Sequence, residues 1–185
     1  MSLLDIRVLG DPILREETTV VTEVTDELRR LIDDMFETMY AAKGIGLAAP
    51  QVGRRERITV IDVDEQRFAL INPEIVAAEG RIKGEEGCLS IPELYGDVER
   101  SARVVVRALD RDGVPFEIEG RELLSRCLQH EIDHLHGRLF LDYLSVLKRR
   151  AAMKKWEVER QKYPGNVRRL TADEVATHHH RDEEL

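Results

Sequence analysis

The sequence predicts an α+β fold, in which antiparallel or mixed β-sheets pack around a central metal-binding helix and a C-terminal helix follows. Three observations indicate this class. Apolar residues recur at helical spacing near the N-terminus, Val- and Ile-rich runs occupy the middle, and helical patterns return after residue 120. Strands that follow one another without long helical connections favour antiparallel pairing. With 185 residues, 42% of them apolar, the chain is large enough for one domain with a sizeable core.

The first helix is expected over residues 25–42. Thr25 is a suitable N-cap, and Asp26 and Glu27 would interact favourably with the positive end of the helix dipole. The apolar residues then recur three or four positions apart, at Leu28, Leu31, Ile32, Met35 and Met39. Gly44 ends the pattern. We interpret this apolar face as a core-packing surface.

Strands are expected in three β-type runs of apolar residues, 58–63, 68–71 and 103–109, where Val, Ile and Phe occur. The dipeptide Asp112-Gly113 indicates a tight hairpin between residues 104–108 and 114–118. Two consecutive strands joined in this way must pair antiparallel, which supports the predicted fold class.

Two helices are expected in the C-terminal part. Gly120 is expected to open the first and Gly137 to end it. The second is expected over 140–162 and stops before Pro164. Residues 166–185 lack periodicity, so we expect them to be frayed or disordered.

Composition narrows the function classes. No apolar run reaches about 18 residues, so no membrane span is expected. The N-terminus lacks the features of a signal or transit peptide, and two cysteines suit a reducing compartment, so a cytoplasmic protein is expected. Residues 148–169 carry nine Lys and Arg against two acids, in a chain of net charge −8. This basic stretch is either a solvated helix face or a nucleic-acid contact, and both readings stay open.

The most informative segment is His130-Glu131-Ile132-Asp133-His134, an HExxH pattern. Residues four apart lie on one face of a helix, so the two imidazoles can bind one metal ion. Glu131 would project beside the ion as a general base. The pattern therefore predicts hydrolysis by a metal-activated water, with a third ligand still to be found.

The third ligand has several candidates. The metzincin pattern would place a third histidine at position 140, which is Phe140 here. A thermolysin-like site would use a downstream glutamate, but Glu157 and Glu159 lie in the basic stretch and look solvated. Cys127 lies seven residues before His134, or about 10 Å along a helix, which is out of easy reach.

The two cysteines receive different interpretations. Cys127 is interpreted as a small apolar residue that lines a pocket, together with Leu123 one turn earlier. Cys88 lies in Glu86-Gly87-Cys88-Leu89-Ser90, just before an extended segment, and could face the helix across a cleft as a thiolate ligand. From its position alone, a buried free cysteine is an equally good interpretation.

At these residues the sequence resembles the peptide deformylases. The resemblance spans residues 6 to 148 and rests on three blocks that occur in the same order and spacing: GIGLAAPQ at 44–51, EGCLS at 86–90 and QHEIDHL at 129–135. It implies the metal ligands Cys88, His130 and His134. It also implies that Glu131 is the acid/base residue and that Gln51 and the backbone N–H of Leu89 stabilise the oxyanion.

The resemblance further implies substrate contacts by Ile45 and Gly46, beside which the peptide would lie as an added strand. Ile45, Leu123 and Cys127 are the candidates for the pocket that holds the methionine side chain. Glycine at 46 would permit close approach of the peptide. Arg100 could pair with Glu86 or with Asp133 behind the metal site.

The implied reaction removes the N-formyl group from the initiator methionine of newly synthesised polypeptides and releases formate. The implied cofactor is one Fe(II) ion per chain, with zinc, nickel or cobalt as substitutes. The implied partners are formyl-Met nascent peptides and the ribosome near its tunnel exit, reached through the basic C-terminal helix. No membrane and no specific DNA partner is expected.

The expected organisation is a catalytic deformylase domain at 1–147, a basic helix and extension at 148–169, and a disordered acidic tail at 170–185. Two alternatives stay open. One is an HExxH zinc peptidase that uses Glu157 or Glu159, and the other is a non-catalytic, metal-stabilised module that binds the ribosome. A purely structural site would have four protein ligands and no need of a base at Glu131.

Overall fold

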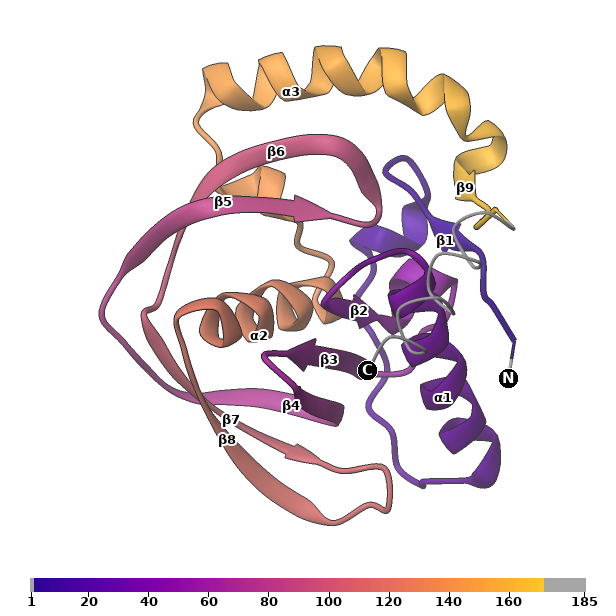
Figure 1. Ribbon diagram of the computed structural model, residues 1–185, viewed down its shortest axis with the longest axis vertical. Coiled ribbons are helices and arrows are strands. Elements are labelled where there is room, and N and C mark those ends of the chain that lie inside the picture. The colour runs from indigo at the N-terminus through magenta and orange to yellow at the C-terminus, as the bar shows by residue number, and fades with distance from the viewer. Residues whose placement is uncertain (1, 172–185) are drawn as a thin grey trace, which may run out of the picture.

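The computed structural model describes residues 2–171 and is an α+β protein with three sheets (Figure 1). A five-stranded antiparallel sheet has the order β2-β3-β4-β7-β8. Its strands are β2 (Gly46–Ala48), β3 (Ile58–Val63), β4 (Gln66–Glu79), β7 (Arg103–Leu109) and β8 (Pro115–Arg121). A separate hairpin pairs β5 (Ile82–Cys88) with β6 (Ile91–Arg100), and a short ribbon pairs β1 (Ile6–Arg7) with β9 (Val167–Arg168). The predicted fold class is confirmed.

Three α-helices accompany these sheets: α1 (Asp26–Ala41), α2 (Glu122–Leu135) and α3 (Val146–Glu159). Short 3-10 helices connect the elements: η1 (Pro12–Arg15), η2 (Ala49–Val52), η3 (Phe140–Tyr143), η4 (Arg160–Lys162) and η5 (Pro164–Asn166). Among the described residues, no helix is long and apolar enough to cross a membrane.

Helix α1 forms as the sequence predicts. The Thr25 side chain accepts a hydrogen bond from the Leu28 N–H at 3.1 Å, which satisfies one of the free donors of the first turn. Its predicted apolar face is buried in a cluster with β2 and β3, and Ile32, Met35 and Met39 are fully buried. The helix therefore supports the strand that carries Gly46.

The hairpin signal at Asp112-Gly113 is also confirmed. Gly113 takes a positive φ of 79°, and β7 and β8 pair from Arg103↔Arg121 to Leu109↔Pro115. Gly120 belongs to β8 and does not open α2, so that expectation was wrong. The space left by its missing side chain is occupied by Leu128 of α2, because a Cβ at residue 120 would lie 2.7 Å from the Leu128 Cδ1.

Helix α2 lies between the two larger sheets (Figure 1). Its apolar face, with Leu124, Leu128 and Ile132, packs on the five-stranded sheet. A different cluster, built around Phe140 and Trp156, lies under β6 and α3. The central, buried position of α2 places the HExxH residues between two layers and away from bulk solvent.

The β5–β6 hairpin was not expected from the sequence. Its strands are rich in Glu and Gly, and in the second half of β6 buried Val98 and Arg100 alternate with exposed residues. A ribbon with only one buried face carries too few Val and Ile residues to be recognised by composition. This hairpin is important because β5 ends at Cys88.

The C-terminal part differs from the prediction in two places. The expected helix over 140–162 is divided, because Leu144 is extended and Ser145 starts a new helix by accepting from the Lys148 N–H at 3.3 Å. Val167–Arg168, expected to be frayed, pairs with Ile6–Arg7. Most of the predicted acidic tail lies outside the described residues.

Candidate metal centre

The two histidines of the HExxH segment face the same point from α2. His130 and His134 are buried, and their Nε2 atoms lie 3.2 Å apart. The helical spacing of four residues brings the two rings together, as predicted. Neither ring points to solvent, so their shared target lies inside the protein.

Cys88 comes to this point from the opposite wall. Its Sγ lies 3.3 Å from the His134 Nε2, and the ligand atoms of Cys88, His130 and His134 all lie within 4.8 Å of one another. A register shift between Gly87 and Cys88 ends the regular pairing of β5 and β6 at this residue. Cys88 therefore faces the helix across the cleft, which is the position that the ligand interpretation requires.

The donor set fits one metal ion. Tetrahedral N and S ligands with bond lengths of about 2.0–2.3 Å lie about 3.3–3.6 Å apart. The observed separations of 3.2 and 3.3 Å are close to those values. Two ring nitrogens and a thiol that converge on one point are the arrangement that a divalent ion such as zinc requires.

Glu86 lies behind His130 and fixes its ring. The Glu86 Oε1 is 2.8 Å from the His130 Nδ1, which leaves the Nε2 free to face Cys88 and His134. Burial opposes ionisation of Glu86, but hydrogen bonds from Arg100 and His130 hold its pKa well below the usual range. Arg100 bonds both Glu86 oxygens at 2.8 and 2.9 Å and also Asp133 at 2.6 Å, so both pairings considered from the sequence are present.

Glu131 is a buried carboxylate beside the ligands. Its Oε2 has no hydrogen-bond partner among the described residues. Burial raises the pKa of Glu131 to about 7. A carboxyl group with such a pKa can take up and release a proton near neutral pH.

Gly46 makes room for Glu131. A Cβ on residue 46 would lie 2.6 Å from the Glu131 Oε1, closer than real Cβ contacts come. The sequence suggested that this glycine admits a peptide. The atom that approaches it in the structure is the carboxylate of the same protein.

Gln51 has a fixed amide orientation. Its Oε1 accepts from the Ala48 N–H at 2.9 Å, so its amide N–H groups face the other way. There the Nε2 donates to the Ser90 Oγ at 3.1 Å and lies 3.6 Å from the Cys88 Sγ. The donor therefore points into the space beside the candidate ligands.

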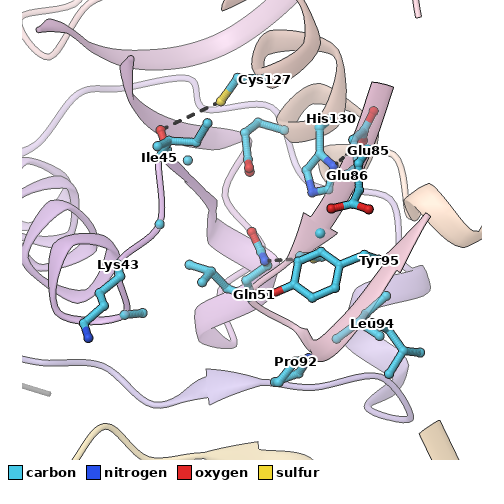
Figure 2. Close-up of a pocket in the computed structure, with 18 of the residues that line it drawn as sticks. Lys43, Ile45, Gln51, Glu85, Glu86, Pro92, Leu94, Tyr95, Cys127 and His130 are labelled. Carbon is cyan, nitrogen blue, oxygen red and sulfur yellow. Dashed lines mark hydrogen bonds and ion pairs between the residues drawn. The ribbon is translucent and has the colours of Figure 1, made fainter. Parts of the chain in front are cut away.

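These groups line a cleft of about 540 Å³ between α2, the 43–46 segment and the β5–β6 hairpin (Figure 2). Figure 2 shows Cys127 and Ile45 together at one wall, where the Cys127 Sγ lies 3.8 Å from the Ile45 carbonyl oxygen. Burial raises the pKa of Cys127 well above its ordinary value, which suits an apolar wall residue. Nine of the ten residues predicted from the sequence line this cleft, Leu89, Gly46 and Leu123 among them. The tenth, His134, is buried and contacts the lining residues Cys88 and His130.

Three further residues, all outside the cleft, bear on the alternative metal ligands considered from the sequence. Glu157 and Glu159 lie on α3 and pair with Arg160 and Lys162, not with the metal-binding group. His136 is at the surface, 2.6 Å from Glu17. The structure therefore offers no support for a glutamate ligand from α3.

Sequence reasoning missed Arg126. It is buried, lines the cleft and donates to the Glu86 Oε2 at 2.7 Å. One signal was available, because Arg126 lies four residues before His130 and a charge on the metal-facing side of a buried helix needs a partner. Its partner lies in the hairpin that the sequence did not predict.

A fold of this class with an HExxH helix facing a thiol across a cleft defines a metal-dependent hydrolase. The model of the polypeptide deformylase family matches residues 3–150. The chain is 56% identical over 161 residues to the peptide deformylase of Alkalilimnicola ehrlichii, covering 85% of this chain and 90% of that protein. It therefore belongs to the polypeptide deformylase family, which confirms the resemblance seen in the sequence.

Solved structures agree. The crystal structure of a peptide deformylase from Legionella pneumophila superposes with a TM-score of 0.83 at 47% identity, over 86% of this chain and 96% of that one. The Ehrlichia chaffeensis peptide deformylase in complex with actinonin gives 0.84 at 41% identity, over 89% and 99%. The fold and the family assignment are thus supported independently.

Proposed function

We propose that this protein hydrolyses the N-formyl group of formyl-methionine at the start of newly synthesised polypeptides and releases formate. One observation carries the proposal: in a member of the deformylase family, Cys88, His130 and His134 converge beside the buried carboxylate of Glu131. A hydrolase needs an activated water and a base next to it, and this arrangement provides for both.

Cys88, His130 and His134 would hold a single ion. When bound, the ion supplies Lewis acidity, which lowers the pKa of water and polarises a carbonyl group. We propose Fe(II) as the native ion, with zinc, nickel or cobalt as substitutes. The ligand set itself favours zinc over ferrous iron, so the choice of iron depends on supply. Metal analysis of protein purified from its own cells without oxygen tests this, and zinc alone would contradict it.

Glu131 would take the proton of the attacking water and deliver it to the departing amine. Both transfers need a carboxyl group that changes protonation near neutral pH, which its raised pKa supports. Negative charge develops on the formyl oxygen during attack. The Gln51 amide, held by Ala48, and the backbone N–H of Leu89 would donate to that oxygen. Because Gln51 is already oriented, no reorganisation is needed when the charge forms.

The cleft would hold the peptide. Ile45 and Gly46, the first residue of the edge strand β2, form one side of the cleft, where a peptide can add as a strand. Leu123 and Cys127, one turn apart on α2, would form the apolar wall for the methionine side chain. A formyl carbon carries only hydrogen, so a narrow site can admit it and exclude acetyl.

We assign the catalytic unit to residues 1–147 and a ribosome contact to residues 148–169. Arg149, Arg150 and Lys154 are exposed on α3, where cations can meet RNA phosphates. Such a contact would place the enzyme near the tunnel exit, where formyl-Met chains emerge, and hence in the cytoplasm. Lys154→Glu should weaken binding to ribosomes at low salt and leave turnover of a short peptide unchanged. Arg30→Glu, an exposed reversal on α1, is the control; equal affinity of both variants would contradict the contact.

The decisive experiment is formate release from formyl-Met-Ala-Ser by Fe(II)-loaded protein prepared without oxygen, beside Glu131→Ala. Rapid release by the wild type and none by the variant would establish the reaction and its base. A folded, metal-loaded wild type that releases no formate would overturn the proposal. Cleavage of an internal peptide bond would instead favour a peptidase, and ribosome binding without any turnover would favour a binding module.

A further inference from the structure

Arg126 connects the two elements that carry the candidate ligands. It lies on α2, one turn before His130, and only 8% of the residue is exposed. Its Nη1 donates to the Glu86 Oε2 at 2.7 Å and to the Val98 carbonyl at 2.9 Å. Its Nη2 donates to the Ile82 carbonyl at 3.3 Å. One guanidinium thus reaches both strands of the β5–β6 hairpin.

Gly84 leaves the space that this guanidinium occupies. A Cβ on residue 84 would lie 3.1 Å from the Arg126 Nη2 and 3.3 Å from its Cζ. The end of a free arginine could move aside, but this one is held by three acceptors. Gly84 and Arg126 therefore form a fitted pair between hairpin and helix.

Glu86 joins this pair to the metal centre. Its Oε2 accepts from Arg126 and from the Arg100 Nε, while its Oε1 accepts from the Arg100 Nη2 and lies 2.8 Å from the His130 Nδ1. Two arginines fix the carboxylate from two sides, and the remaining direction belongs to His130. The orientation of the imidazole follows from how firmly Glu86 is held.

The hairpin needs such a link because it shares no strand pairing with the five-stranded sheet. β5 ends at Cys88, whereas both histidines lie on α2. The distance between the thiol and the imidazoles therefore depends on how the hairpin docks on the helix. We propose that Arg126 is a positioning residue for metal binding, which docks the β5–β6 hairpin on α2 and orients His130 through Glu86. The inference rests on the proposed metal-dependent function.

The competing explanation is that Arg126 contributes only to folding stability. Metal retention separates the two, because a purely structural role would leave the affinity of the folded protein unchanged. Arg126→Met keeps the apolar stem, and Glu86 stays paired through Arg100, so no buried charge is left alone. Arg126→Lys keeps the charge but cannot reach three acceptors at once. Arg107→Met removes an exposed arginine that pairs with Glu117 on the five-stranded sheet, and is the matched control.

The experiment loads each full-length protein with Co(II) and measures its loss to a competing chelator, together with the ligand-field and thiolate charge-transfer bands. Folding is checked by circular dichroism. We expect Arg126→Met to bind Co(II) about 10- to 100-fold more weakly, with altered bands. Arg126→Lys should lie between that variant and the wild type, and Arg107→Met should match the wild type.

A folded Arg126→Met protein with wild-type affinity and spectrum would overturn the inference. If that variant does not fold, Arg126→Lys decides: weakened binding supports the positioning role, and wild-type binding with a wild-type spectrum refutes it. Formate release by the unaltered protein is measured separately. Its failure would reject the proposed reaction, whereas the role of Arg126 is judged by metal retention alone.

Discussion

Gly46 leaves the space that the proposed catalytic carboxylate of Glu131 occupies, and Gly46→Ala tests the importance of this fit. A Cβ there would lie 2.6 Å from the Glu131 Oε1, 2.8 Å from its Cγ and 2.9 Å from its Cδ. Ordinary contact begins at 3.4 Å, so the carboxylate must retreat by roughly 0.8 Å. Glu131 is buried on a helix packed between two layers, and β2 is held against β3, so neither side yields easily.

The expected effect is on the chemical step. A displacement of about 1 Å at a reacting group can lower a rate by about 100-fold, which corresponds to about 2.7 kcal/mol of activation free energy. We therefore expect kcat for formyl-Met-Ala-Ser to fall by about two orders of magnitude. Metal content should stay unchanged, because the three atoms nearest to the alanine methyl group all belong to Glu131 and to none of the candidate ligands. Overpacking should also lower the free energy of unfolding by about 1–3 kcal/mol.

The matched control is Gly96→Ala. Its Cβ would lie 2.8 Å from the Leu144 Cδ2, an overlap of similar size with an apolar side chain outside the cleft lining. This variant should lose stability and keep its kcat. If Gly46→Ala is folded and metal-loaded yet turns over within threefold of the wild type, the reasoning about Glu131 and its position is refuted.

Three further predictions concern other parts of the molecule. Gln51→Ala should lower kcat by about 10²- to 10³-fold with metal content unchanged, and formate release within fivefold of the wild type would argue against an oxyanion role. Burial, and after it the hydrogen bond to Asp62, raises the pKa of Tyr40. The contribution of the Tyr40 hydroxyl to stability is therefore complete below pH 10 and declines above it. Urea unfolding at pH 8 and pH 11 should show that the difference in stability between wild type and Tyr40→Phe is smaller at pH 11. Trp156→Ala should lower the free energy of unfolding in urea by about 3–5 kcal/mol, because this residue is 1% exposed and its Nε1 donates to the Leu9 carbonyl. A loss below about 1 kcal/mol would mean that α3 does not pack on the rest of the protein.

The features that the sequence predicted correctly depend on short-range spacing. The pairing of His130 with His134 follows from four residues of helix. The turn at Asp112-Gly113 is also local, because its hydrogen bonds go to Asp110 a few positions earlier. Cys88 could not be chosen over a buried free thiol from position alone. Its place depends on the β5–β6 hairpin, whose mixed composition hides one buried face.

The contacts that the sequence could not predict join residues far apart in the chain. Arg126 meets Glu86, forty positions away, and Gly46 meets Glu131 across the cleft. No local pattern records such contacts, because helix and strand periodicities describe which face is buried and not what it meets. The helix expected over 140–162 was wrong for a local reason, since the Ser145 cap divides it and apolar periodicity does not respond to caps.

The ribbon of β1 and β9 joins the two ends of the described chain, and this affects the order in which the protein folds. Ile6 pairs with Arg168, so the first strand has no partner until residues 167–168 have been synthesised. The same N-terminal segment supports the turn after Cys88, because the Leu9 N–H donates to the Ser90 carbonyl at 2.9 Å. Two-residue strands at chain ends are the first to open. Mild heating should therefore disturb the Leu89–Ser90 turn, and with it turnover, before the helical signal of α1 and α2 declines.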